Sequence, residues 1–143
     1  MTLSDAAAPA ETATQTAPKP IPPFVRLGGA PVISAIVDQF YDLMENDPAY
    51  AELRAMHAPD LAPMRTSLKG FLTGWAGGPR DWFDANPGRC MMSMHSGFTI
   101  SDQTAGQWAQ AMRRAIESVA TADQQMAKAM AGVLEELAMG MAR

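Results

Sequence analysis

The segment LKGFLTGWAGGP (Leu68–Pro79) sets the class of the fold, because it shows how a helix of this chain is built and where it stops. Its apolar residues lie three and four positions apart, which is the spacing of one face of an amphipathic helix: Leu68, Phe71, Leu72 and Trp75. The Gly77–Pro79 sequence then ends the helix, since glycine suits the position after the last turn and proline cannot continue it. We predict a helix capped by Asp60 that stops before Gly77.

The same period recurs along the rest of the chain, so we predict an all-α protein. Leu27–Pro31 is a predicted turn, and Asn46–Pro48 breaks the helix that follows it. A short helix is expected from about Ala49 to Met56. Ser101 or Asp102 opens a long helix, and Thr121 or Asp123 opens the last one. The residues expected to face inward on the three long helices are Val32, Ile33, Ile36, Val37, Phe40, Tyr41 and Met44; then Trp108, Met112, Ile116 and Val119; then Met126, Met130, Val133, Leu134, Leu137 and Met141.

The N-terminal region has a different composition from the remainder. Residues 1–23 are rich in alanine, proline, threonine, glutamate and glutamine and lack a hydrophobic period. Such a segment cannot bury enough apolar surface to offset the entropy of ordering it. We predict a disordered or loosely packed extension over 1–23 and a single folded domain over 24–143.

Composition and charge exclude several classes of protein. The net charge is −4 and no basic patch stands out, which argues against a nucleic-acid partner. No apolar run is long enough to span a bilayer, and the N-terminus lacks the basic and apolar regions of a signal peptide. A single cysteine, Cys90, excludes an internal disulfide. We therefore expect a cytoplasmic protein with no membrane partner.

The segment from Arg80 to Gly97 shows little periodicity, although a short helix is expected over Cys90 to His95. A long irregular stretch in a packed helical domain needs a reason, and a ligand that fills space beside it is one. The 12 methionines point the same way, because methionine adapts to irregular shapes, but they are also ordinary core residues in place of leucine.

His95, in MMSMHSGFTI (Met91–Ile100), is the candidate metal ligand of this segment. Neither of the two histidines has the spacing of a zinc site. Haem, in contrast, needs one axial protein ligand because the porphyrin supplies four nitrogens. The alternative is a core histidine that hydrogen-bonds to the backbone.

Several motifs together resemble the truncated haemoglobins of group II, from about Leu27 to the C-terminus. They occur in the order and spacing of that family: GGA (Gly28–Ala30), Phe40-Tyr41, MHAPDL (Met56–Leu61), Leu68–Pro79, Trp82-Phe83, Met91–Ile100 and WAQAM (Trp108–Met112). The resemblance implies a two-over-two helical sandwich around haem b.

The resemblance also implies roles for individual residues. His95 matches the proximal ligand of the iron, while Tyr41 and Trp108 match distal hydrogen-bond donors, and His57 falls at a position that faces the distal side. Met64 and Leu68 match residues that control access of the ligand. The residues expected to line the haem or its distal side are Phe40, Leu68, Phe71, Trp82, Met91, Phe98, Ile100, Trp108 and Met112.

Simpler interpretations of these residues stay open. Tyr41 and Trp108 are also plausible core aromatic residues, and His57 is also a plausible exposed loop residue. The chain departs from the family at Met94, where many relatives carry an arginine that pairs with a haem propionate. The partners available by sequence are then Arg65, Lys69 and Arg89.

The resemblance implies a haem protein that reversibly binds dioxygen and other small ligands, namely nitric oxide, carbon monoxide, cyanide and sulfide. The alternative is a peroxidase-like or nitric-oxide-detoxifying enzyme, with His57 and Tyr41 as candidate catalytic residues and an external electron donor that the sequence does not identify. A third, haem-free hypothesis is a helical module whose methionine-rich faces receive a partner helix. We expect a monomer or a weak homodimer.

Overall fold

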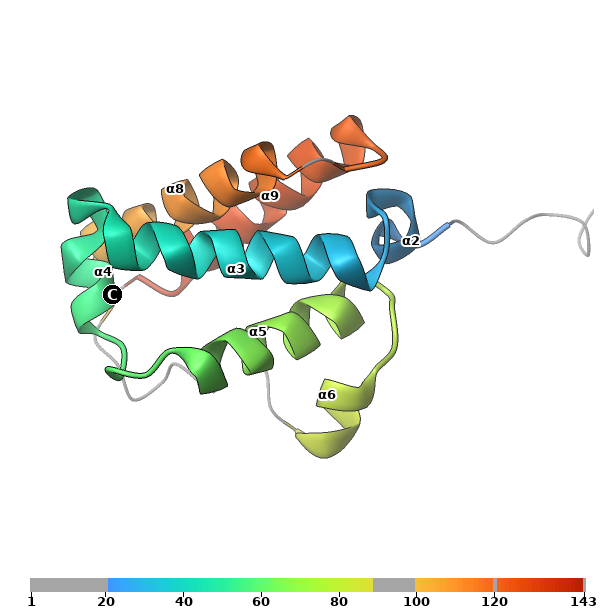
Figure 1. Ribbon diagram of the computed structural model, residues 1–143, viewed down its shortest axis with the longest axis horizontal. Helices are drawn as coiled ribbons and strands as arrows, with labels where there is room; N and C mark the ends of the chain where they lie inside the picture. The colour runs from blue at the N-terminus through green and yellow to red at the C-terminus, as the bar shows by residue number, and fades with distance from the viewer. Residues whose placement is uncertain (1–20, 89–99, 120, 143) are drawn as a thin grey trace, which may run out of the picture.

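A computed structural model describes residues 21–88, 100–119 and 121–142, and every regular element in these ranges is helical. The prediction of an all-α fold is therefore confirmed. The predicted extension lies outside the described residues as far as residue 20. The elements, in chain order (Figure 1), are α2 (Pro23–Leu27), α3 (Ala30–Asn46), the 3-10 helix η1 (Pro48–Tyr50), α4 (Ala51–Ala55), α5 (Ala62–Trp75), α6 (Asp81–Ala85), α8 (Asp102–Ser118) and α9 (Gln124–Gly140).

Four long helices form the body of the molecule. Helix α3 packs against both α5 and α8, and α8 packs along α9, so that α3 lies between α5 and the α8–α9 pair (Figure 1). The side chains where these helices meet are excluded from water, and their burial is the main stabilising contribution to the fold. The largest fully buried ones are Leu27, Ile33, Ile36, Val37, Phe40, Met44, Tyr50, Leu72, Met112 and Leu134.

Helix α3 has the inward face that the sequence predicted. The turn before it uses Gly28 and Gly29 at φ angles of 124° and 82°, and Pro31 occupies the first helical turn. Its end at Asn46 is also as predicted. There the carboxylate of Asp47 accepts the N–H of Ala49 at 2.9 Å and starts the 3-10 turn.

The end of α5 confirms the stop predicted from Gly77–Pro79. Gly77 has a φ of 97°, which favours glycine. The N–H of Gly77 donates to the carbonyl of Gly74 at 3.1 Å, and that of Gly78 donates to Thr73 at 2.8 Å. These two bonds form a Schellman cap. At the other end, the carboxylate of Asp60 accepts the N–H of Ala62.

Helix α6 corrects the prediction that the chain is irregular from Arg80. Five residues are too few for a hydrophobic period to be visible, so the helix had no signal of its own. It forms because Trp82 and Phe83 pack on α5, where Gly70 and Gly74 leave room for their rings. The remainder of the predicted irregular segment, from Arg89 to Gly97, lies outside the described residues, together with the short helix predicted there.

The last two helices begin with side-chain caps. Ser101 and Thr104 form a reciprocal capping box at the start of α8, and Asp123 accepts the N–H of Met126 at the start of α9. One inward prediction on α9 is wrong, because Val133 is 46% exposed. The buried face of α9 is narrow and passes through Met130, Ala131 and Leu134.

Helix α2 fastens the N-terminal side of the described chain to the start of α9. The guanidinium of Arg26 binds the carboxylate of Asp123, and the N–H of Ala122 donates to the carbonyl of Leu27 at 3.1 Å. Asp123 therefore caps α9 and binds α2 at once, which keeps its pKa below the ordinary value. Among the described residues, none of the helices is both long and apolar enough to cross a membrane.

Candidate functional site

A cavity opens between the α3–α5 pair and the α8–α9 pair. Its empty volume is about 920 Å³, part of which is open to solvent. Every long helix contributes to its wall, as do α4 and α6. The lining consists of Tyr41, Leu53, Met56, His57, Met64, Ser67, Leu68, Phe71, Trp82, Ile100, Thr104, Ala105, Trp108, Leu137, Ala138 and Met141. Most of these side chains are apolar, so the polar groups of the wall are few and identifiable.

The cavity brings together eight of the residues that the sequence singled out, from five separate segments. They are Tyr41, His57, Met64, Leu68, Phe71, Trp82, Ile100 and Trp108. Phe40 and Met112 are fully buried and do not line it. Phe40 lies behind the wall, with its ring centroid 4.9 Å from that of Tyr41 and 5.3 Å from that of Trp108. The remaining predicted site residues, Met91, His95 and Phe98, lie outside the described residues.

Tyr41 is a buried phenol on the cavity wall. It is 3% exposed, and burial raises its pKa to about 12, although the positive charge of Arg65 acts in the opposite direction. The hydroxyl therefore keeps its proton at neutral pH and is a hydrogen-bond donor. Its ring meets that of His57 edge to face at 6.2 Å between centroids.

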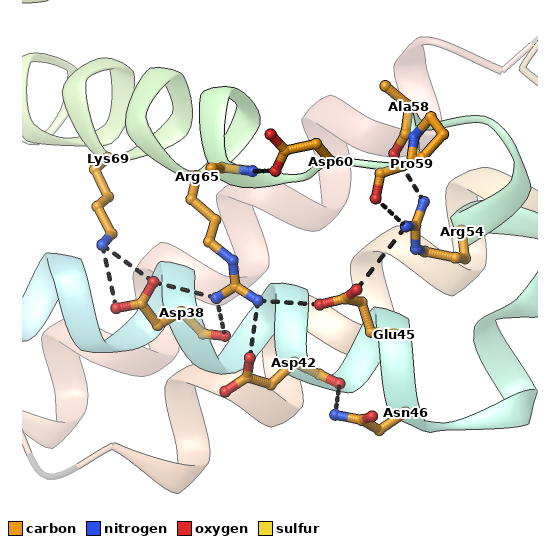
Figure 2. A network of polar contacts seen from close by, with 11 residues as sticks. Asp38, Asp42, Glu45, Asn46, Arg54, Ala58, Pro59, Asp60, Arg65 and Lys69 are labelled. Atoms are coloured by element: carbon orange, nitrogen blue, oxygen red, sulfur yellow. Dashed lines mark hydrogen bonds and ion pairs between the residues drawn. The ribbon is translucent and has the colours of Figure 1, made fainter.

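His57 has a defined proton position. Its Nδ1 lies 2.9 Å from the carbonyl oxygen of Leu53. A carbonyl oxygen only accepts, so Nδ1 carries the proton, and Nε2 of the neutral ring is an acceptor. The backbone beyond it is held as well: Arg54 donates to the carbonyls of Ala58 at 3.0 Å and Pro59 at 2.9 Å (Figure 2). His57 is thus a half-buried residue of the cavity wall.

An aromatic cluster stands at one end of the α5 face of the cavity. The rings of Phe71, Trp82 and Phe83 lie 5.1 to 5.4 Å apart between centroids, and this cluster joins α5 to α6. Near the start of the same helix, Met64 is 38% exposed and lies where the cavity wall reaches solvent. Leu68, one turn further along α5, is half-buried. The α5 face therefore runs from the exposed Met64 to the buried Phe71 and its aromatic neighbours.

Two of the candidate propionate partners are engaged elsewhere. Arg65 binds Asp38, Asp42 and Glu45, and Lys69 binds Asp38, all on α3 (Figure 2). The third candidate, Arg89, lies outside the described residues. Within the described part of the chain, no group of three or more histidine, cysteine or acidic side chains could hold a metal ion.

Comparison with known proteins identifies the family. The sequence pattern of the family described as Bacterial-like globin matches residues 23–143. The chain belongs to this family. The Group 2 truncated hemoglobin YjbI of Bacillus subtilis (strain 168) is 28% identical over 91 residues, which cover 64% of this chain and 67% of that protein.

Solved structures of bacterial globins share the fold. The cold-adapted truncated hemoglobin of Pseudoalteromonas haloplanktis TAC125 superposes with a TM-score of 0.81 at 27% identity, over 86% of this chain and 98% of that one. The group II 2-on-2 hemoglobin of Agrobacterium tumefaciens has a TM-score of 0.82 at 23% identity, over 90% and 98%. The predicted resemblance to group II truncated haemoglobins and the two-over-two fold are confirmed, and the family implies haem binding.

Half of the residues that line the cavity of this globin were not predicted as site residues. The missed residues are Leu53, Met56, Ser67, Thr104, Ala105, Leu137, Ala138 and Met141. Leu137 and Met141 were predicted only as inward-facing residues of α9. Ser67 and Thr104 carried no signal, because a single hydroxyl on a helix is common on any surface.

Proposed function

We propose that the cavity holds haem b, with His95 as the axial ligand of the iron, and that the protein reversibly binds dioxygen and related small ligands. The observation that carries this proposal is the cavity wall itself, where Tyr41, His57 and Trp108 are grouped in otherwise apolar surroundings. Nitric oxide, carbon monoxide, cyanide and sulfide are the other ligands that suit such a site.

The wall suits haem in chemistry. Ligand cavities are lined mostly by apolar side chains with a few polar groups among them, and this wall has the same composition. Phe71, Trp82 and Trp108 supply aromatic side chains to this wall, which suits the apolar faces of a macrocycle. When bound, the haem iron supplies the position at which a small ligand coordinates.

The polar groups of the wall would act as hydrogen-bond partners of the bound ligand. The Tyr41 hydroxyl carries its proton at neutral pH, as any tyrosine with a pKa of 10.0 or above does, and burial raises its pKa to about 12. The indole of Trp108 only donates. A ligand that leaves strands each buried donor at a cost of roughly 1–3 kcal/mol. Two donors would slow release by roughly 10- to 10⁴-fold, which suits sensing, scavenging or chemistry on the ligand better than rapid oxygen delivery.

A second candidate function is peroxidase-like or nitric-oxide-detoxifying turnover with an external electron donor. The hydrogen bond from His57 Nδ1 to Leu53 favours it, because it fixes the orientation of the ring in the cavity wall. A histidine oriented in this way by a carbonyl is able to take a proton from a hydroperoxide. We propose the cytoplasm as the location, and a monomer or weak homodimer that binds neither nucleic acid nor a membrane.

An absorption spectrum tests the proposal. The purified protein, with haemin added if needed, should show a Soret band, and His95→Ala should lose it. A protein that never shows the band is not a haem protein. The variant His57→Phe separates the two functions: unchanged oxidation of a dye by peroxide, with altered release of the ligand, would remove His57 from catalysis.

A further inference from the structure

We propose that Gln107 is a positioning residue for His57 and acts through the backbone of Leu53. This inference rests on the proposed role of His57 at the ligand site. Gln107 lies on α8, directly before Trp108, and is half-buried. Its side-chain oxygen Oε1 accepts the backbone N–H of Leu53 at 3.1 Å, across 54 positions of the chain.

The Leu53 N–H needs this partner because of its place in α4. Leu53 is the third residue of a five-residue helix, and N–H groups in the first turn have no acceptor within the helix. Tyr50, at the N-cap position, provides no side-chain cap. Gln107 therefore supplies from α8 the acceptor that the local sequence lacks.

The other backbone group of Leu53 holds the histidine ring. The Leu53 carbonyl accepts the Nδ1–H of His57 at 2.9 Å and the N–H of Met56 at 3.1 Å. The Leu53 side chain is 4% exposed and lines the same cavity. A fixed Leu53 thus fixes both the orientation of the His57 ring and the nitrogen that carries its proton.

Other contacts hold this part of the chain on α8, but they engage different groups. Arg114 binds the carboxylate of Asp47 at 2.8 Å and the hydroxyl of Tyr50 at 3.0 Å. Gln103 donates to the carboxylate of Glu52. Neither contact involves the backbone group that leads to His57. Helix α8 consequently carries Trp108 on the cavity wall and, one residue earlier, the group that positions His57.

The variant that tests this is Gln107→Leu, which keeps the side chain close in size but removes the acceptor. Gln107→Glu retains an acceptor oxygen and should restore the wild-type properties. Gln103→Leu is the matched control, because it removes a glutamine one turn earlier that donates to the exposed side chain of Glu52 on α4. If Gln107→Leu does not fold, Gln107→Asn, which withdraws the amide by one methylene, provides the same measurement.

The measurements are made by NMR on the full chain; if it carries haem, the iron is first reduced with dithionite and then bound to carbon monoxide, which makes it diamagnetic. In Gln107→Leu we expect the Leu53 amide to exchange with solvent about tenfold faster, as loss of one hydrogen bond implies. The ring ¹⁵N shifts of His57 should change from one tautomer to a mixture.

Faster Leu53 exchange with an unchanged His57 tautomer would overturn the inference, as would unchanged exchange. The same changes in Gln107→Glu or Gln103→Leu would also overturn it. These readouts are independent of the proposed function, because a protein without a Soret band still reports the Leu53 exchange rate and the His57 tautomer.

Discussion

The guanidinium of Arg65 binds the carboxylates of both Asp38 and Asp42, so one side chain of α5 spans a full turn of α3 (Figure 2). The nitrogen–oxygen distances are 3.2 and 2.8 Å, and Glu45 lies at 3.3 Å from the same group. Burial raises the pKa of Asp38, but the hydrogen bonds and positive charges of Lys69 and Arg65 outweigh that effect. The pKa of Asp38 is therefore below its ordinary value. This network joins the helices that carry Tyr41 and Met64.

Replacing Arg65 by glutamine should lower the free energy of unfolding by about 1–2 kcal/mol at low salt, since a surface ion pair contributes up to about 1 kcal/mol and Arg65 has three partners. The loss should shrink at high salt because screening weakens the remaining repulsion among the three acidic side chains. Urea denaturation at both salt concentrations measures it. Arg113→Gln, which removes a single exposed pair with Glu135, is the control and should cost less. Equal losses in the two variants would contradict the network.

The buried phenol of Tyr41 should make the protein sensitive to alkali. Its pKa is raised from 10.0 to about 12 in the folded state, so the folded protein holds this proton more tightly than the unfolded chain does. The associated stability is complete below pH 10 and is lost as the pH rises toward 12, by up to about 2.7 kcal/mol for two pH units. In Tyr41→Phe this part of the loss should disappear.

Denaturation midpoints measured between pH 9 and pH 12 test this. The control is Tyr50→Phe, which removes the second tyrosine, a buried residue whose hydroxyl accepts a hydrogen bond from Arg114. A steep alkaline loss that persists unchanged in Tyr41→Phe would assign it to another group.

Gly74 is predicted to resist substitution although it lies within a helix. A Cβ there would lie 2.5 Å from Cδ2 of Phe83, which is closer than real contacts allow. We expect Gly74→Ala to lower the free energy of unfolding by about 1–3 kcal/mol, as overpacking does. Gly132→Ala, within α9, meets nothing within 4 Å and should instead raise it by up to about 1 kcal/mol, because alanine is the better helix former. Thermal denaturation of the two variants gives the sign of the change in stability for each. A change of the same sign in both variants would refute this account of α5–α6 packing.

The contribution of the Ser101 capping box to the free energy of unfolding should also be measurable by denaturation. The Ser101 hydroxyl accepts the N–H of Thr104 at 3.0 Å, and the Thr104 hydroxyl accepts the N–H of Ser101 at 3.1 Å. Ser101→Ala should cost about 0.5–2 kcal/mol, and Ser101→Asp, which keeps an acceptor, should cost little. Chemical denaturation distinguishes them. No difference between the two variants would mean that the cap contributes nothing to stability.

The long helices could be predicted from sequence because each carries enough turns for its hydrophobic period to be visible. This holds for α3, α5, α8 and α9, and the break at Asn46–Pro48 followed from turn chemistry. Helix α6 was not predicted because five residues do not establish a hydrophobic period. Its stability comes from packing on Gly70 and Gly74 of α5. Val133 was predicted to face inward because it is hydrophobic and adjoins Leu134, so it widens the apolar face that the sequence indicates for α9. The neighbouring helices cover only the narrower face that contains Leu134.

The site could be predicted only in part. Tyr41, His57 and Trp108 were brought together by resemblance, since residues this far apart have no common period. The polar contacts that organise the site gave no signal at all. Gln107 contacts Leu53, and Arg65 contacts Asp38, only once the helices have packed. The sequence alone does not distinguish these pairs from many other possible pairs of glutamine, arginine and aspartate residues.

The attachment of α2 to α9 has a consequence for how the chain matures. Arg26 and Asp123 are 97 positions apart, so α2 leaves the ribosome long before its partner exists. The entropic cost of closing a loop of that length is small, since each doubling of a loop adds only about 0.6 kcal/mol. The delay comes instead from the time needed to synthesise the partner. Synthesis of α9 therefore sets the earliest moment at which α2 can dock on it, and until then the apolar side chains of α2 are available to chaperones.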